Sequence, residues 1–197
     1  MRQEVARAKA AIDLASHGKK VVIVSTGDAG IYGMAGLVLE ILGDRNDVDV
    51  TVLPGVTAAS AAAAALGAPL MNDFAVLSLS DLLTPRDKIE RRLNAVADAD
   101  LVLALYNPRS HKRVEPFEMA LRILRAVRPH DTVVGIVRNA LREGQEVCVT
   151  TLGEISPSAV DMMSIVVIGN SYTKMRNGRM LTVRGYPLDA ADFKQNE

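Results

Sequence analysis

The sequence predicts an α/β protein built from two lobes, and three observations support that fold class. Short apolar runs rich in β-branched residues alternate with helical patterns as far as residue 139. Strands that are separated by helices of about ten or more residues pair in parallel through right-handed crossovers. Beyond that point the apolar runs follow one another with little helix between them, which indicates antiparallel pairing. A chain of 197 residues that is 49% hydrophobic can bury one large core or two modest ones.

The first lobe is expected to span residues 1–82 and to hold a mostly parallel sheet with flanking helices. Apolar residues at helical spacing predict an amphipathic first helix that ends at Gly18. Nearly unbroken apolar runs predict strands that are buried on both faces. In chain order, the expected elements are a helix up to residue 17, strand 19–26, helix 31–43, strand 48–54, helix 56–67 and strand 74–80.

The second lobe is expected to span residues 83–197 and to hold a mixed sheet. Thr84 and Pro85 fit a helix cap followed by a proline in the first turn. In chain order, the expected elements are helix 85–99, strand 100–108, helix 114–127, strands 131–139 and 146–152, a short turn or helix at 156–160, and strands 164–171 and 179–186.

The composition argues against several classes of protein. Lys plus Arg equals Asp plus Glu at 23 each, so no whole-chain field attracts nucleic acid or a membrane surface. No apolar run approaches the roughly 18 residues of a membrane-spanning helix, and the N-terminus lacks the apolar core of a signal peptide. The single cysteine, Cys148, lies in an apolar run, where we expect a buried thiol and a reducing compartment. We therefore expect a cytoplasmic protein that binds neither nucleic acid nor a membrane.

Four loops follow the carboxyl ends of expected strands, which is where ligands collect in open α/β sheets. Each contains glycine, proline or polar residues, and the four would converge on one edge. Their sequences are GDAGIYG at residues 27–33, PGVTA at residues 54–58, NPRSHKR at residues 107–113 and RNALREG at residues 138–144.

The first two loops each allow a structural and a functional interpretation. Gly27 permits a sharp turn, and Gly30 permits close approach of a ligand to the main chain. Asp28 between them either caps the next helix or accepts hydrogen bonds from a ligand hydroxyl. The loop lacks the Lys-Ser/Thr ending of a P-loop and the full G-x-G-x-x-G pattern, so it is not a phosphate cradle. Thr57 heads an alanine-rich helix, either as its N-cap or as a ligand contact.

The third loop joins an asparagine to a dense basic segment. Asn107 suits the turn before a proline. Arg109, Lys112 and Arg113 follow at a strand's carboxyl end, where an anion-binding role competes with a solvated charged face. None of the three histidines has metal-ligand spacing, so no metal site is expected. No Ser/His/Asp or Cys/His arrangement can be placed, and no catalytic acid or base is assigned.

Taken together, the loops resemble those of the precorrin methyltransferases of cobalamin synthesis, most of all the precorrin-3B C17-methyltransferase branch. The resemblance is carried by GDAGIYGMA, PGVTAA, LSLSD and LALYNPRS, of which YNPRS is specific and GDAG alone is weak. It runs from RAKAAIDLA near the N-terminus to SIVVIGNS. The family implies a two-lobed tetrapyrrole methylase fold, a homodimer, and S-adenosylmethionine as the donor that methylates a carbon of a reduced tetrapyrrole. In the C17 branch, methylation accompanies contraction of the macrocycle.

The resemblance also implies which residues bind the cofactor and the substrate. Those expected on the methionine and sulfonium side of the cofactor are Gly27, Asp28, Gly30, Ile31, Thr57 and Ala58. Those expected from the second lobe are Tyr106 and Asn107 on the adenosine, and Arg138 and Asn139 through their main chain. The substrate carries many carboxylates, which guanidinium and ammonium groups bind well. The expected substrate-binding residues are Arg109, Lys112, Arg113 and Arg142.

One feature of the family is not found in the sequence. The family opens with a strand that ends in a Gly-x-Gly-Pro-Gly-type loop, and no such loop precedes GDAG here. Two other interpretations therefore stay open. The chain is a truncated, non-catalytic remnant that binds a ligand or dimerises, or it methylates another tetrapyrrole carbon.

Overall fold

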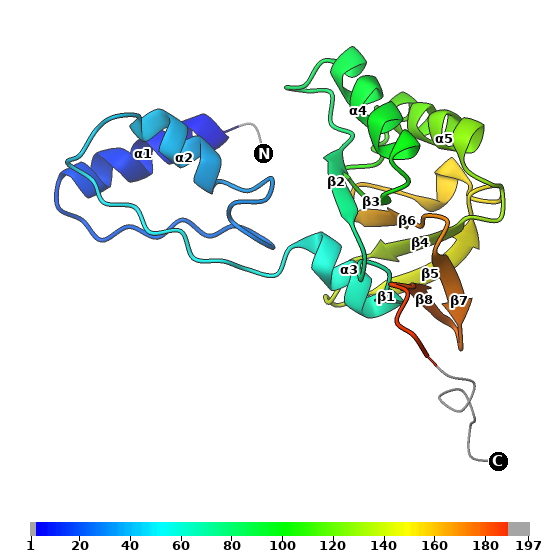
Figure 1. Cartoon of the computed structure of the whole chain (residues 1–197). Helices are drawn as coiled ribbons and strands as arrows, with labels where there is room; N and C mark the ends of the chain where they lie inside the picture. The colour runs from blue at the N-terminus through cyan, green and yellow to red at the C-terminus, as the bar shows by residue number, and fades with distance from the viewer. Residues whose placement is uncertain (1–2, 189–197) are drawn as a thin grey trace. The chain divides into compact units, whose positions relative to one another are not determined.

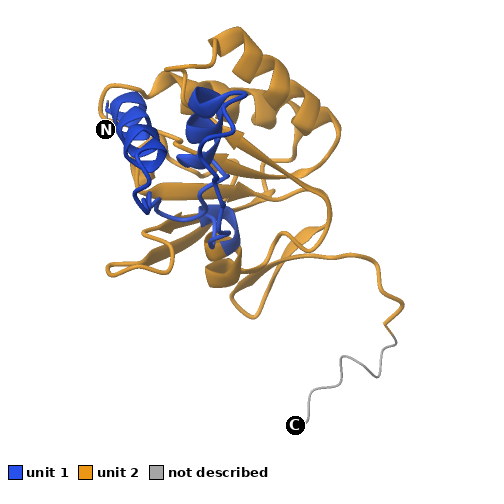
Figure 2. Ribbon diagram, turned by 90° about the vertical axis from the view of Figure 1, so that its left-hand side faces the viewer, with its two compact units in different colours: residues 1–60 blue, residues 61–197 orange. Residues whose placement is uncertain are grey.

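The computed structural model describes residues 3–188, and the chain divides into two compact units. Unit 1 is Met1–Ser60 and unit 2 is Ala61–Glu197 (Figure 2). The predicted lobes, residues 1–82 and 83–197, are a different division, and their boundary stays a prediction. The α/β fold class is confirmed, since helices alternate with the strands of two sheets. Across the described residues, no helix combines the length and the apolar character needed to cross a bilayer.

Unit 1 is held together by two helices that pack through a small apolar core. These are α1 (Glu4–Ser16) and α2 (Ala35–Leu42), both seen in Figure 1. The side chains that they bury against one another are at most 8% exposed and comprise Ala8, Ile12, Val38 and Leu42. On each helix the two residues are four positions apart, which places them on the same face.

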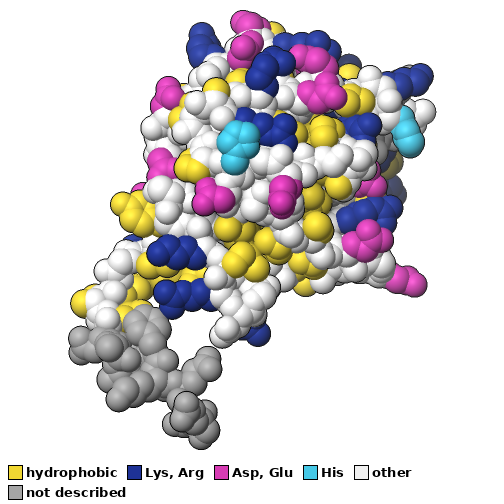
Figure 3. Space-filling model, turned by 90° about the vertical axis from the view of Figure 1, so that its right-hand side faces the viewer, with side chains coloured by type: hydrophobic (Ala, Val, Ile, Leu, Met, Phe, Trp, Pro, Cys, Tyr) yellow, Lys and Arg dark blue, Asp and Glu magenta, His cyan; other side chains and the backbone are white. Residues whose placement is uncertain are grey.

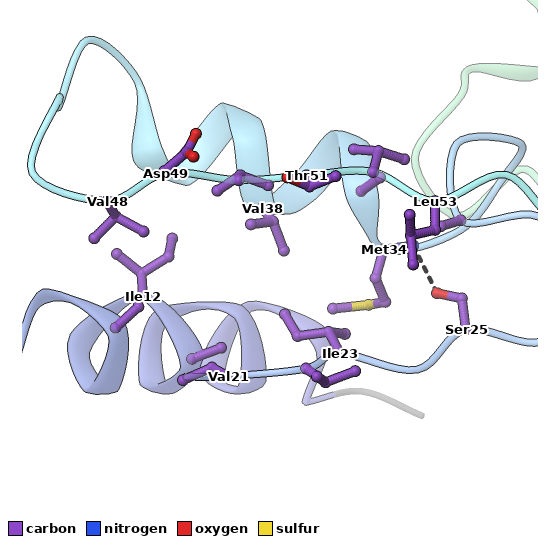
Figure 4. Close-up of a pocket in the computed structure, with 17 residues that line it drawn as sticks. Ile12, Val21, Ile23, Ser25, Met34, Val38, Val48, Asp49, Thr51 and Leu53 are labelled. Atoms are coloured by element: carbon purple, nitrogen blue, oxygen red, sulfur yellow. Dashed lines mark hydrogen bonds between the residues drawn. The ribbon is translucent and has the colours of Figure 1, made fainter. Parts of the chain in front are cut away.

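The two strands expected in this unit, residues 19–26 and 48–54, are wrong, because neither segment forms a ladder with any described residue. The segments run in the same direction on opposite sides of a cavity of about 310 Å³ (Figure 4). Their β-branched side chains favour an extended chain, but a strand also needs a neighbour whose N–H and C=O groups face its own. Val22 and Val24 are accordingly 85% and 87% exposed.

Unit 2 is built on a five-stranded mixed sheet. Its strands are β2 (Phe74–Ser78), β3 (Val102–Tyr106), β4 (Val133–Arg138), β5 (Glu146–Thr151) and β6 (Ser164–Ile168). They lie in the order β2-β3-β6-β4-β5. β2 and β3 pair in parallel, whereas β6 pairs antiparallel with both β3 and β4. The carboxyl ends of β2, β3 and β4 therefore lie at one edge of the sheet, together with the start of β6.

Two helices cover one face of this sheet (Figure 1), namely α4 (Arg86–Asp98) and α5 (Glu115–Val127). Both confirm helices expected from the sequence. Alternate residues of the central strands meet them, because successive side chains of a strand point to opposite faces. Leu103 and Leu105 of β3 are fully buried in this core together with Phe117 of α5.

The opposite face of the sheet contains a position that only glycine can occupy without rearrangement. Gly135 lies on β4, between two residues that face the helical core. α3 (Ala58–Leu66) places the buried side chain of Leu66 against it. A Cβ at Gly135 would overlap Leu66, so the glycine lets the helix approach the sheet closely.

A second, three-stranded sheet has the order β1-β8-β7. Its strands are β1 (Gly67–Ala68), β7 (Thr173–Arg176) and β8 (Arg179–Thr182), and a 3₁₀ turn, η1 (Pro157–Ala159), confirms the short helix expected nearby. β7 was not expected, because its sequence TKMR is polar. The available signal was Asn177-Gly178, a dipeptide that favours two-residue hairpin turns, and both residues have positive φ.

Cys148 is exposed, so the expectation of a buried thiol is wrong. The residue lies on β5, an edge strand whose only neighbour in the sheet is β4. The first three residues of β5 are exposed. An edge strand is covered less completely than a central one, so an apolar run in the sequence does not ensure burial there.

Replacing a buried residue of β3 is expected to destabilise unit 2. Leu105→Ala should lower the free energy of unfolding by about 2–5 kcal/mol, because it removes buried apolar contacts and leaves a cavity. Urea denaturation followed by circular dichroism measures the change. Leu83→Ala is the matched control, since Leu83 is 98% exposed and should change stability by less than about 0.5 kcal/mol. Equal changes in the two variants would contradict this account of the core.

Candidate functional site

Asp28 joins the two glycine-containing loops of unit 1 through three backbone N–H groups. Its Oδ1 accepts hydrogen bonds from Gly30 at 2.8 Å and from Ile31 at 3.1 Å. Its Oδ2 accepts one from Gly55 at 2.9 Å. The hydrogen bonds from Gly55 and Gly30 hold the pKa of Asp28 below its usual value, against the opposing effect of burial. The carboxylate is therefore ionised at neutral pH.

This geometry rules out the helix-cap interpretation of Asp28. The following helix, α2, begins at Ala35 with Met34 at its N-cap, well beyond the reach of Asp28. The carboxylate instead closes a local turn and ties it to the second loop. Each carboxylate oxygen can accept about two hydrogen bonds, so Oδ2 keeps room for a further donor.

The same two loops touch backbone to backbone at a pair of glycines. Gly27 has a φ of +77°, so the sharp turn expected there is confirmed. A Cβ on Gly55 would collide with the carbonyl oxygen of Gly27. Sequence analysis did not single out Gly55, although it lies in the PGVTA loop. The structure brings together in this loop pair Gly27, Asp28, Gly30, Ile31, Thr57 and Ala58.

In unit 2, Asn107 follows β3 directly and lies in the left-handed region with a φ of +49°. Asparagine enters this region more readily than most residues, which suits the turn expected before the proline. Its Nδ2 donates to Ser78 Oγ, at the end of β2, over 3.0 Å. The N–H of Leu79 donates to the Tyr106 carbonyl over 3.0 Å, so the two strand ends stay paired.

The end of β4 is tied to the segment before β6. Asn139 also has a left-handed φ, of +50°, and its N–H donates to the Met163 carbonyl over 3.1 Å. Arg138 Nε donates to Asp161 Oδ2 over 2.9 Å. Burial works to raise the pKa of Asp161, but hydrogen bonds from Arg138, Ser164 and the Met163 N–H together hold it below its usual value.

The four predicted substrate-binding residues divide into two pairs. Arg109 Nη1 donates to the Pro157 carbonyl over 2.9 Å, and both terminal nitrogens of Arg113 donate to carbonyl oxygens. Burial lowers the pKa of Arg113, against an opposing effect of Asp81. Lys112 and Arg142 are exposed, and within the described part of the chain neither side chain forms a hydrogen bond or ion pair. These two cations are free to meet an anionic ligand.

The predicted cofactor residues thus fall into two groups, one in each unit. The group at the sheet edge of unit 2 comprises Tyr106, Asn107, Arg138 and Asn139. Sequence reasoning missed Ser78 and Asp161 at this edge. Ser78 lay within the quoted LSLSD, whereas Asp161 carried no local signal, because only the pairing of β4 with β6 brings it to Arg138.

Neither the surface charge nor the candidate metal ligands among the described residues extend these two groups of cofactor residues. On the face drawn in Figure 3, acidic and basic side chains are intermingled and no continuous basic surface forms. Within residues 3–188, no three His, Cys, Asp or Glu side chains are placed to hold a metal ion. The candidate residues are therefore a loop pair with one ionised carboxylate in unit 1, and strand-end loops with exposed cations in unit 2.

These features define an α/β protein whose glycine- and asparagine-containing loops are held by hydrogen bonds, in unit 2 at the carboxyl ends of its strands. The chain belongs to the family described as Tetrapyrrole (Corrin/Porphyrin) Methylases, whose profile matches residues 2–156. The family predicted from the loops is thereby confirmed. So is the prediction of a methyltransferase similar to the C17 branch, given the relatives that follow.

Two curated relatives share much of the sequence. The chain is 49% identical over 189 residues to a probable cobalt-factor III C(17)-methyltransferase of Salmonella typhimurium, covering 95% of this chain and 78% of that protein. It is 44% identical over 191 residues to the cobalt-factor III methyltransferase of Priestia megaterium, covering 94% of this chain and 35% of that protein. The chain therefore spans about a third of the Priestia protein and most of the Salmonella one.

Two solved structures of methyltransferases are also similar to this chain. The crystal structure of the methyltransferase CobJ matches with a TM-score of 0.88 and 37% identity, covering 92% of this chain and 77% of that one. The structure of CbiF, a cobalt precorrin-4 methyltransferase, matches with a TM-score of 0.65 and 26% identity, covering 83% and 69%. The methylase fold and a role in the methylation steps of cobalamin biosynthesis follow from these likenesses.

Asp28→Asn is expected to destabilise unit 1 in a pH-dependent way. The amide keeps one acceptor oxygen but presents an NH₂ group where the other oxygen meets a backbone donor. Because the native pKa of Asp28 is lowered, its contribution is present above its ordinary value of 3.8 and is lost as the pH falls through the native value. The stability difference from wild type should therefore be clear at pH 7 and shrink towards pH 3.

Urea denaturation at several pH values measures that difference. Asp44→Asn is the matched control, since Asp44 is exposed on the same unit and its side chain forms no hydrogen bond or ion pair within residues 3–188. A difference for Asp28→Asn that is the same at pH 7 and pH 3 would show that the carboxylate charge does not hold the loops.

Proposed function

We propose that this chain transfers the methyl group of S-adenosylmethionine to carbon 17 of a tetrapyrrole of the cobalt-factor III or precorrin-3 type, with contraction of the macrocycle. The observation that carries the proposal is the 49% identity to a probable cobalt-factor III C(17)-methyltransferase over 95% of the chain. The names of the relatives favour the cobalt-containing substrate. We also propose that the protein acts as a homodimer in the cytoplasm.

The loop pair of unit 1 fits a cationic methyl donor. S-adenosylmethionine supplies a positively charged sulfonium whose methyl group is already electrophilic. Asp28 is ionised and keeps acceptor capacity at the loop pair, so it offers a negative charge to such a ligand. The absence of a Cβ at Gly55 lets the two backbones come into contact, and the φ of +77° at Gly27 forms the turn between them. Gly30, Ile31, Thr57 and Ala58 complete the donor contacts that we propose for unit 1.

The sheet edge of unit 2 fits the adenosine part of the donor. The left-handed conformations of Asn107 and Asn139 turn the chain sharply where β3 and β4 end. Peptide groups at such turns offer both donors and acceptors, which a purine ring and a ribose can use. Tyr106 adds an aromatic ring beside Asn107, and Arg138 contributes its main chain next to Asn139.

Positioning is the main contribution that the transfer requires of the protein. The methyl carbon leaves sulfur and bonds to the tetrapyrrole carbon, so an electron-rich carbon must be held in line at about 3–3.5 Å. That step needs no strong base, and we assign none. Exposed Lys112 and Arg142 would hold the carboxylates of the substrate, since charged hydrogen bonds to carboxylates are strong and directional.

A second candidate is a protein that binds the donor or dimerises without turnover. One observation favours it: residues 20–24 and 48–54 form no backbone hydrogen bond within the described part of the chain. A scaffold with unpaired segments beside its loop pair positions ligands less sharply, and a small misplacement lowers the rate steeply. Methylation of a tetrapyrrole carbon other than 17 is a further variant of the main proposal.

Calorimetric titration with S-adenosylhomocysteine and a turnover assay separate these candidates. We expect micromolar binding, and formation of a C17-methylated, ring-contracted product from cobalt-factor III, identified by mass spectrometry and NMR. Binding without product would support the second candidate. Methylation at another carbon would correct the regiochemistry. No binding at all would overturn the proposed function and leave only dimerisation without turnover.

Removing either exposed cation should weaken tetrapyrrole binding more than donor binding. We expect Lys112→Ala and Arg142→Ala each to weaken tetrapyrrole binding about three- to tenfold at low salt, and to leave S-adenosylhomocysteine binding unchanged, because each loses one charged contact with a carboxylate. Fluorescence titration of the tetrapyrrole measures this. Lys88→Ala, at an exposed position of α4, is the matched control. Equal weakening of both ligands would contradict the assignment.

A further inference from the structure

The guanidinium of Arg113 lies between the ends of two parallel strands. Its Nη1 donates to the carbonyl of Leu79, just after β2, over 2.5 Å. Its Nη2 donates to the carbonyl of Asn107, just after β3, over 2.9 Å. The same Nη2 lies 3.4 Å from Met162 Sδ, in the segment before β6. One side chain therefore contacts three segments that are far apart in the sequence.

The loop that carries Arg113 is itself closed. The Ser110 N–H donates to the Arg113 carbonyl over 2.9 Å, and the Arg113 N–H donates to the Ser110 carbonyl over 3.2 Å. This tight turn directs the side chain back towards the strand ends. The backbone and side chain of Arg113 thus hold both ends of the segment between Asn107 and the turn.

The contact matters most at Asn107, whose conformation needs support. A residue other than glycine keeps a left-handed conformation only where its surroundings hold it there, although asparagine adopts it more readily than most. Arg113 fixes the carbonyl of Asn107, while the Asn107 side chain donates to Ser78 Oγ over 3.0 Å. These contacts join the ends of β2 and β3 in a single hydrogen-bonded unit.

Two features show why arginine is suited to this position. The planar fork of a guanidinium directs two nitrogens at two separate carbonyls, whereas a lysine ammonium is a single point charge. Arg113 is also partly buried beside the fully buried Leu79, and the charged group that faces it is Asp81. Both terminal nitrogens already donate to the protein, so a substrate carboxylate would have to compete with these contacts.

We propose that Arg113 is a positioning residue, which locks the ends of β2 and β3 so that Asn107 and Ser78 present a preformed edge to the methyl donor. This inference rests on the proposed function, because the ligand of that edge is the donor of the transfer. It replaces direct substrate binding as the role of Arg113. Loss of the guanidinium frees the segment from Asn107 to Arg113 while the sheet core stays intact.

Amide hydrogen exchange and donor binding, measured on the full chain, test the proposal. In Arg113→Ala, exchange at the N–H groups of Leu79 and Ser110 should accelerate at least tenfold, while Val134 and Val166 in the core strands stay protected. Affinity for S-adenosylhomocysteine should fall about tenfold by calorimetry. Arg113→Lys should lie between wild type and Arg113→Ala, and Arg122→Ala, at an exposed position of α5, is the matched control.

Each other outcome has a defined meaning. Unchanged exchange at both loop amides, or faster exchange throughout the core, would overturn the proposal, since Arg113 would then be either idle or a general stabiliser. Faster loop exchange with unchanged affinity would also overturn it. If Arg113→Ala does not fold, the lysine variant decides by the same two readouts. Failure of the wild-type chain to bind S-adenosylhomocysteine would overturn the proposed function and this inference together, and only that outcome does so.

Discussion

The antiparallel position of β6 between β3 and β4 is the constraint on which the rest of unit 2 depends. All five residues of β6 are buried, and the strand pairs with a neighbour on each side. This arrangement leaves β3 and β4 pointing in the same direction, as β2 and β3 already do. Three carboxyl ends therefore meet at one edge, and the segment that enters β6 meets them there. Every functional side chain that we assign in this unit follows from that placement.

Two charged side chains hold loops in place through hydrogen bonds to the main chain, one in each unit. In unit 1 the carboxylate of Asp28 accepts hydrogen bonds from three backbone N–H groups and forms no ion pair with any described residue. In unit 2 a guanidinium, that of Arg113, does the reverse by donating to two carbonyls. Both arrangements fix a loop while leaving the outer surface of the loop open to a ligand, which suits a reaction that depends on positioning.

Several predictions made from sequence depended on local chemistry and are confirmed. The helices α4 and α5 are expected between the apolar runs at residues 74–80, 100–108 and 131–139, and the turn at Gly27 follows from the freedom of glycine. The motif YNPRS marked the end of β3 and, with three other motifs, identified the family that the comparisons confirm. The prediction of strands at residues 19–26 and 48–54 is wrong, because a strand exists only where another strand supplies its hydrogen bonds.

The sequence by itself determined which segments are helical, where the chain turns, and which residue types stand at the strand ends, since these depend on neighbours within a few positions. Only the tertiary structure decided which distant residues form hydrogen bonds with one another. Three hydrogen bonds each connect residues more than twenty positions apart: Arg138 to Asp161, Asn107 to Ser78, and Gly55 to Asp28. Such contacts are set by strand order and by backbone approach, and neither property is encoded in the local pattern of apolar and polar residues.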